Sequence, residues 1–277
     1  MDDDVEALHR SRVASRRVRE VLPVLHGSEA AGGAPAALRK RVRQLTRALG
    51  GVRELDVALL ILDELAARHP ELGAVVAAVR CRVADDRRAR RQTMAEQLDD
   101  SAGHRLPEDL EALSSTVQVD PSAILVGRLE NRVARRTDRL EGAIAEAGSL
   151  FVSERLHAVR IAAKQLRYAL ELVHEFGGVG TRRLTNTLKQ YQDLLGRLHD
   201  LEVVSGYVRR EAWGATNGHA ENARRLQEVI DLEIRVLHAT YLAGVGALGR
   251  LLAACRSTVL TRLAAGRKPR RQPGGSQ

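Results

Sequence analysis

Aromatic residues are scarce in this sequence, at only 3% of the chain, whereas hydrophobic residues make up 44%. Leu, Val and Ala must therefore fill the core, and these residues suit helix-on-helix packing better than a β-sandwich. No segment shows the strict alternation of apolar and polar residues that is typical of a half-buried strand. We therefore expect an all-α protein.

Cysteine is nearly absent as well, since Cys81 and Cys255 are the only two. A chain without a disulfide framework or a CxxC motif is typical of a reducing compartment. The first residues, MDDDVEALHRSRV, are charged and lack the apolar core of a signal peptide. We find no apolar run of membrane-spanning length. These absences predict a cytoplasmic protein without a membrane partner.

Motifs for metal or nucleotide chemistry are missing too. The chain has nine histidines but no HExxH, and it has neither a GxxxxGK[ST] phosphate loop nor a GxSxG elbow. We expect no metal, no cofactor and no enzymatic activity. A phosphorelay through His9 or His157 is less favoured than simple binding, because nothing beside either histidine resembles a general base.

Positive charge is in excess, with 44 Lys and Arg against 35 Asp and Glu, a formal net charge of +9. Lysine occurs only at Lys40, Lys164, Lys189 and Lys268, so nearly all of this charge is arginine. The planar guanidinium binds phosphate or carboxylate in a bidentate manner. An acidic partner is one interpretation of this excess, and an ordinary solvated surface is the other.

Proline and glycine divide the chain into long helical patterns within one expected domain, 1–265, followed by a disordered basic tail, 266–277. Residues 99–121 are expected to be mostly loop, with one short helix around 108–115. The expected helices cover about 3–25, 35–51, 53–68, 70–98, 121–147, 151–176, 182–195, 200–213 and 220–263.

Two blocks of sequence recur in the same order. LHRSRVASRRVREVLPVLH, from Leu8, aligns without gaps with LHAVRIAAKQLRYALELVH, from Leu156. LGGVRELDV, from Leu49, aligns with LGRLHDLEV, from Leu195. Chance similarity between Arg-rich amphipathic helices is the alternative, but the second match makes it a poor explanation. We predict a first repeat of about 1–147 and a second of about 148–265, forming a duplicated bundle with pseudo-twofold symmetry.

The first block of each repeat carries a basic stripe opposite an apolar face. Cations at i,i+3 and i,i+4 spacing repel one another, so an uninterrupted stripe indicates a surface that binds an anion. A phosphate chain suits such a stripe, because its charges also come in a regular row. The alternative is a solvated face, or pairing with the acids Glu54, Asp56, Asp200 and Glu202. The two stripes are His9, Arg12, Arg16 and Arg19 in the first repeat, and His157, Arg160, Lys164 and Arg167 in the second.

At these residues the sequence resembles the CHAD domain, the conserved-histidine α-helical domain. The resemblance rests on HRSRVASRRVR, HAVRIAAKQLRY, GGVRELDV and LKQYQDLLGRLHDLEV, and it covers about residues 5–260. It implies two pseudo-twofold-related four-helix-bundle halves around a basic groove. It also implies binding of inorganic polyphosphate and association with polyphosphate granules.

The resemblance places the basic positions of the family on the eight residues of the two stripes, and on Arg43 and Lys189 in the second helix of each half. Glu54 stands where the family often has Asp, and His199 where Asn is frequent. The Arg-rich helix 71–98 is not assigned to the groove. Some members also carry a CYTH triphosphate-tunnel domain, but its ExExK strand is absent here, so we expect a stand-alone binding domain.

Two other functions remain open. A nucleic-acid-binding protein would suit the charge, but the few aromatic residues offer no stacking platform and no helix-turn-helix is evident. A phosphohydrolase or phosphotransferase acting on polyphosphate would need carboxylates to hold Mg²⁺ beside the basic row. Nothing in the sequence shows that Glu54, Asp56, Asp200 or Glu202 reaches the groove.

Overall fold

The computed structural model describes residues 5–26, 34–98, 108–112, 123–176, 180–213 and 217–265. Nearly all of these residues are helical and none of them lies in a strand, which confirms the all-α class. The expected tail, 266–277, lies outside the described residues. Besides a short helical segment at 108–112, the helices are α1 (Val5–His26), α2 (Ala34–Arg68), η1 (Pro70–Leu72, a 3-10 helix), α3 (Gly73–Gln97), α5 (Ala123–Ala147), α6 (Ser153–Glu175), α7 (Thr181–Trp213) and α8 (Asn217–Ala265).

Helices α2 and α7 are each continuous, so the predicted breaks at Gly50–Gly51 and after Leu195 are wrong. Glycine weakens a helix by only about 1 kcal/mol relative to alanine. Apolar residues on both sides of each expected break are buried, and their packing holds the helix through it. These residues are Leu49, Val52 and Leu55 in α2, and Leu195, Leu198 and Leu201 in α7.

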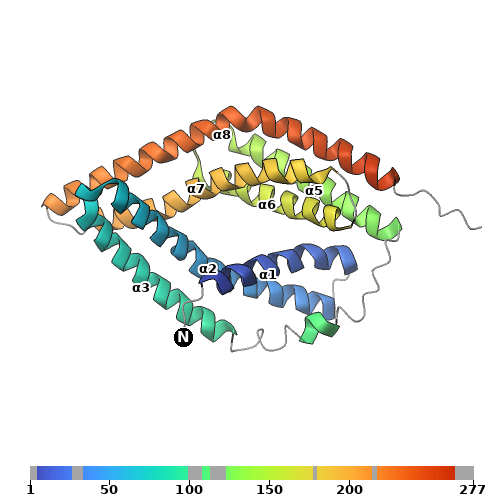
Figure 1. Ribbon diagram of the computed structural model, residues 1–277, viewed down its shortest axis with the longest axis horizontal. Helices are drawn as coiled ribbons and strands as arrows, with labels where there is room; N and C mark the ends of the chain where they lie inside the picture. The colour runs from blue at the N-terminus through green and yellow to red at the C-terminus, as the bar shows by residue number, and fades with distance from the viewer. Residues whose placement is uncertain are drawn as a thin grey trace, which may run out of the picture.

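Two large cores hold the molecule together, and α7 and α8 belong to both of them (Figure 1). The α5–α6 core contains α5, α6, the first half of α7 and the second half of α8. The α2–α3 core contains the second half of α2, α3, the second half of α7 and the first half of α8. Helix α1 packs on the first half of α2 through two smaller clusters, around Leu8 and Leu22.

The α2–α3 core joins helices from both expected repeats, so no boundary between cores falls near residue 147. Leu55 and Leu201, which hold matching places in the two aligned blocks, are both buried in this core. The second repeat therefore meets the first through equivalent segments. This supports the pseudo-twofold relation, which stays a prediction.

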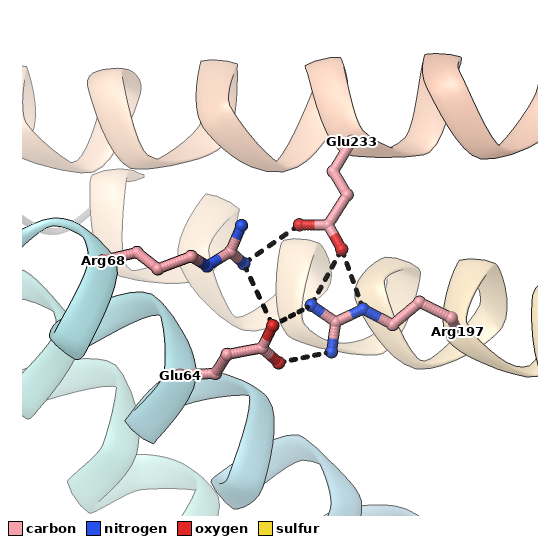
Figure 2. Close-up of polar contacts among 4 residues, drawn as sticks. All are labelled: Glu64, Arg68, Arg197 and Glu233. Carbon is pink, nitrogen blue, oxygen red and sulfur yellow. Dashed lines mark hydrogen bonds and ion pairs between the residues drawn. The ribbon is translucent and has the colours of Figure 1, made fainter.

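A network of four charged side chains ties α2, α7 and α8 together beside the α2–α3 core (Figure 2). The guanidinium of Arg197 donates to Glu64 at 2.7 Å and to Glu233 at 2.8 Å. Arg68 donates to Glu233 at 3.1 Å and lies 3.5 Å from Glu64. Because each charge has two opposite neighbours, the network fixes how the three helices meet better than an isolated surface pair would.

One described stretch, Gly218–Ser257 in α8, is long and apolar enough by length and composition to cross a membrane, with a mean hydropathy of 1.3 over its 18-residue window. The expectation that no apolar run reaches this length is therefore wrong. Of this window, 22% is buried, and α8 contributes Ile230 and Ile234 to one large core and Tyr241 and Leu248 to the other.

Helix α1 is anchored to α5 by a nearly buried ion pair. Glu20 accepts from Arg132 at 2.5 and 3.0 Å, and Arg136 lies 3.6 Å away. Replacing Arg132 with Met is expected to cost about 2–3 kcal/mol of unfolding free energy, because the Glu20 carboxylate stays buried with one weaker partner. Denaturant titration measures this, with Arg135→Met, an exposed position on the same helix, as the control. Equal losses in both variants would contradict the assignment.

Candidate functional site

The basic faces of α1 and α6 lie on a cleft between α1, α2, α6 and α7. Two adjoining cavities, of about 570 and 700 Å³, make up this cleft and share Arg16, Arg160, Lys164 and Asp200 in their walls. The apolar faces of α1 and α6 turn the other way, as Leu22 and Leu166 show, both of which are fully buried. The periodicity of each helix therefore places one face in a core and the other in the cleft.

The cleft brings most of the predicted binding residues together. Arg19 and Arg43 are absent from the lining that the described residues form, and both are exposed. The side chain of His9 lies outside the described residues. The predicted residues that do line the cleft are Arg12, Arg16, His157, Arg160, Lys164, Arg167 and Lys189.

Equivalent arginines of the two repeats occupy equivalent places in the cleft. Arg12 Nη1 donates to the carbonyl oxygen of Gly50 at 2.9 Å. Arg160 Nε lies 3.8 Å from where a Cβ on Gly196 would stand. Gly50 and Gly196 match in the aligned blocks, so in each repeat an arginine from the first helix lies over a glycine of the second. A longer side chain at either glycine would occupy the space of the guanidinium.

The cations at the centre of the cleft lack acidic partners in the part of the chain that the structure describes. Within the described part of the chain, Arg12, Arg16, Arg160 and Lys164 make no ion pair within 4.0 Å. Arg160 Nε and His157 Nδ1 are buried and have no hydrogen-bond partner among the described groups. Buried polar atoms without partners are costly, so a ligand that pairs with these two atoms would lower that cost.

Burial and mutual repulsion shift the pKa values of these cations. Burial, reinforced by Arg160, Arg16 and Arg12, lowers the pKa of Lys164 to about 7. Burial, with the charges of Arg16 and Arg160, lowers the pKa of Arg12 to about 10. Burial also lowers the pKa of His157 below its ordinary value, and neighbouring cations add to the effect. Each shift has the sign expected when an electropositive cavity disfavours further positive charge.

Two acids, Glu54 and Asp200, stand among the cations at equivalent places in the two repeats. Glu54 Oε1 lies 3.2 Å from His199 Nε2, and this hydrogen bond lowers the pKa of Glu54. Burial raises the pKa of Asp200, although Arg160 opposes the shift. Among the described side chains of the basic stripes, none makes an ion pair within 4.0 Å with either acid.

The other acids considered as partners of the stripes lie elsewhere. Asp56 accepts from Arg87 of α3 at 2.6 Å, and it does not line the cleft. Glu202 is also absent from the described lining. One stripe residue does pair: Arg167 donates to Glu171 at 2.5 Å and to Gln192 at 2.9 Å.

Several lining residues were missed by the sequence interpretation. Arg53 and His199 hold matching places in the aligned blocks, so the repeat itself was a signal for both. Arg47 has no such signal, since its counterpart is Asp193. The Arg-rich helix reaches the edge of the cleft through Arg90, whose Nη1 lies 2.9 Å from a Cβ built on Gly51, a cleft-lining residue.

The described residues contain no group of three or more His, Cys, Asp or Glu side chains placed to hold a metal ion. Five carboxylates among these residues line the cleft, but they are outnumbered by the Arg, Lys and His side chains. Such a surface binds anions with several negatively charged oxygens.

Comparison with known proteins agrees with this description. Two uncharacterized proteins from strains of Mycobacterium tuberculosis are each 27% identical over 259 residues, covering 85% of this chain and 48% of theirs, so the chain spans about half their length. A crystal structure of the CHAD domain from the plant Ricinus communis is similar with a TM-score of 0.56 and 27% identity, covering 93% of this chain and 82% of that one. The CHAD domain family model matches residues 1–209. The chain therefore belongs to the CHAD domain family.

Proposed function

We propose that this chain binds inorganic polyphosphate in the cleft between α1, α2, α6 and α7, without hydrolysing it. The observation that carries the proposal is the convergence of Arg12, Arg16, Arg160 and Lys164 without acidic partners among the described residues. Bringing like charges together costs free energy unless an anion offsets the repulsion. Polyphosphate carries a negative charge on each phosphate unit, in a regular row. Successive phosphates can therefore contact cations from both α1 and α6.

The shape and lining of the cleft favour polyphosphate over nucleic acid. Cavities of about 570 and 700 Å³ have the size of small-molecule pockets, whereas sequence readout of duplex DNA uses a protruding helix or β-ribbon that enters a major groove about 12 Å wide. Tyr168 is the one Phe, Tyr or Trp in the described lining, and it already contacts the guanidinium of Arg167 at 4.7 Å. Single-stranded nucleic acid would need several such stacking surfaces.

A polyphosphate-cleaving enzyme is the second candidate, because Glu54 and Asp200 stand beside the cations. Phosphoryl transfer generally needs carboxylates that hold Mg²⁺ next to the phosphate. Glu54 is hydrogen-bonded to His199, and within the described residues no group of three or more His, Cys, Asp or Glu side chains is placed to hold a metal ion. Binding is therefore the simpler function, and we place the chain at polyphosphate granules in the cytoplasm.

A competition experiment tests this function. Labelled polyphosphate should shift with the protein in a retardation gel, and duplex DNA at equal phosphate concentration should fail to displace it. With a slope of about −0.7 per phosphate neutralised, four contacts predict that log K falls with log salt with a slope of about −3. Displacement by DNA would favour nucleic acid, and steady release of orthophosphate with Mg²⁺ would make the chain an enzyme.

A further inference from the structure

Lys164 is the one lysine at the centre of an arginine-lined cleft. Its side chain projects from α6 into both cavities. The charges that act on it most are Arg160 from its own helix, and Arg16 and Arg12 from α1, all of the same sign. Asp200 of α7 is the acid that acts on it most, and it makes no ion pair with Lys164 within 4.0 Å.

The remaining titratable groups of the two cavities come from all four helices, α1, α2, α6 and α7. Helix α2 supplies Glu54 as well as the cations Arg47 and Arg53. His199 of α7 is hydrogen-bonded to Glu54, and its ring lies 4.7 Å from the ring of His157 on α6. The second cavity adds the acids Glu64, Glu171 and Asp193 and the cations Arg17, Arg167, Lys189 and Arg197. Across the two cavities together, positive and potentially positive groups outnumber the acids.

The choice of lysine at this position matters, because lysine is rare in the chain. The equivalent residue in the first repeat is Arg16, and arginine supplies nearly all the other positive charges. Arginine keeps its proton in proteins, whereas a buried lysine readily loses it. Lys189, the other lysine of the lining, belongs to the second cavity alone, whereas Lys164 lines both cavities. Lys164 is thus the central lysine, whose charge depends on what the cleft contains.

We propose that the cleft binds polyphosphate together with a proton, which the Lys164 amine takes up from solvent as phosphate oxygens arrive. This inference rests on the proposed function and adds its regulation by pH. In the empty cleft the neutral amine relieves the crowding of guanidinium groups. In the filled cleft the anion reverses the sign of the local field, and the ammonium form then donates hydrogen bonds to phosphate.

The coupling has a definite direction. The pKa of Lys164 is about 7 in the empty cleft and moves toward the ordinary value of 10.5 when the anion is present. Proton uptake is therefore small below pH 6 and approaches one per cleft near pH 8.5. Linkage then requires the association constant to fall by about tenfold per pH unit where a full proton is taken up.

Calorimetric titration with long-chain polyphosphate tests the proposal. At pH 8.5, in two buffers of different ionisation enthalpy, the difference in heat gives the number of protons taken up. This pH lies above the ordinary pKa values of histidine and of terminal phosphate groups. Lys164 therefore dominates the proton uptake that the titration measures. We expect uptake close to one proton by the wild-type chain, and an association constant that falls steadily from pH 7 to pH 9.

Two variants assign the proton. Lys164→Arg keeps the positive charge and is expected to bind with less than half the wild-type proton uptake, whereas Lys40→Arg, at an exposed site on α2 outside the cleft lining, should keep all of it. Wild-type binding without uptake, or undiminished uptake in a folded Lys164→Arg, would overturn the proposal. If Lys164→Arg does not fold, a pH-independent wild-type affinity still overturns it. Absence of wild-type binding from pH 6 to 9 would instead defeat the proposed function, and this inference with it.

Discussion

Polyphosphate affinity is expected to fall by about 1–3 kcal/mol when either Arg16 or Lys164 is replaced with alanine, because each change removes a charge-assisted contact to phosphate. The two residues hold matching places on α1 and α6, and both line the two cavities. A loss in each variant would show that both repeats contribute to one site. Since the two positions share a cleft, the double variant should lose less binding free energy than the two single variants lose together.

The fold should survive these changes, since neither residue makes an ion pair with a described acid. Arg225→Ala, at an exposed site on α8, controls for the loss of one positive charge and should change affinity little. Equilibrium binding and the melting temperature should be measured together. Unchanged affinity with a large drop in melting temperature would show that the stripes serve the fold and not a ligand.

Stability without ligand is expected to rise when Lys164 is replaced with methionine, by about 1–4 kcal/mol near pH 6.5, since apolar residues of similar volume are often better tolerated than buried charges. The pKa of Lys164 is about 7 in the folded chain and near 10.5 when unfolded. Between these values the unfolded chain binds more protons, so wild-type stability increases with pH across this window. The advantage of methionine is therefore largest below pH 7 and disappears near pH 10.5.

Denaturant unfolding of both proteins at pH 6.5, 8 and 9.5 measures this difference, and comparing the two removes the contribution of every other titrating group. If the difference in unfolding free energy between the two proteins is the same at all three pH values, Lys164 is ionised to the same extent in the folded and unfolded chains. Lys164→Met should also bind polyphosphate poorly. In the wild-type chain, Lys164 therefore contributes to binding at a cost to the stability of the empty protein.

The basic stripes could be predicted from sequence because helical periodicity places Arg12 and Arg16, or Arg160 and Lys164, on one face opposite leucines. Their convergence on one groove was expected from the resemblance to the CHAD domain and not from periodicity. The continuity of α2 and α7 could not be predicted, because the glycines at Gly50 and Gly51 usually end a helix. Whether such a helix continues depends on partners from other elements, and local sequence does not carry that information.

The pairing of individual charges was beyond the sequence for a similar reason. Asp56 has the same local pattern as Glu54, yet Arg87 of α3 binds Asp56, whereas Glu54 faces the cleft. Arg167 belongs to a stripe by periodicity, but Glu171 one turn later binds it. A side chain of a given type and spacing is available to a ligand only if no neighbour reaches it first, and this depends on the tertiary arrangement.

The sharing of α7 and α8 between both large cores has a consequence for how the chain folds as it is made. The α2–α3 core needs Leu201 and Ala223, which follow Val83 of α3 by about 120 and 140 residues. At about 5–20 residues per second, the ribosome adds the longer of these stretches in about 7–28 s. Throughout this interval α2 and α3 can pack only on each other in this core, so the first part of the chain to be made must wait for the last helices before its core can close.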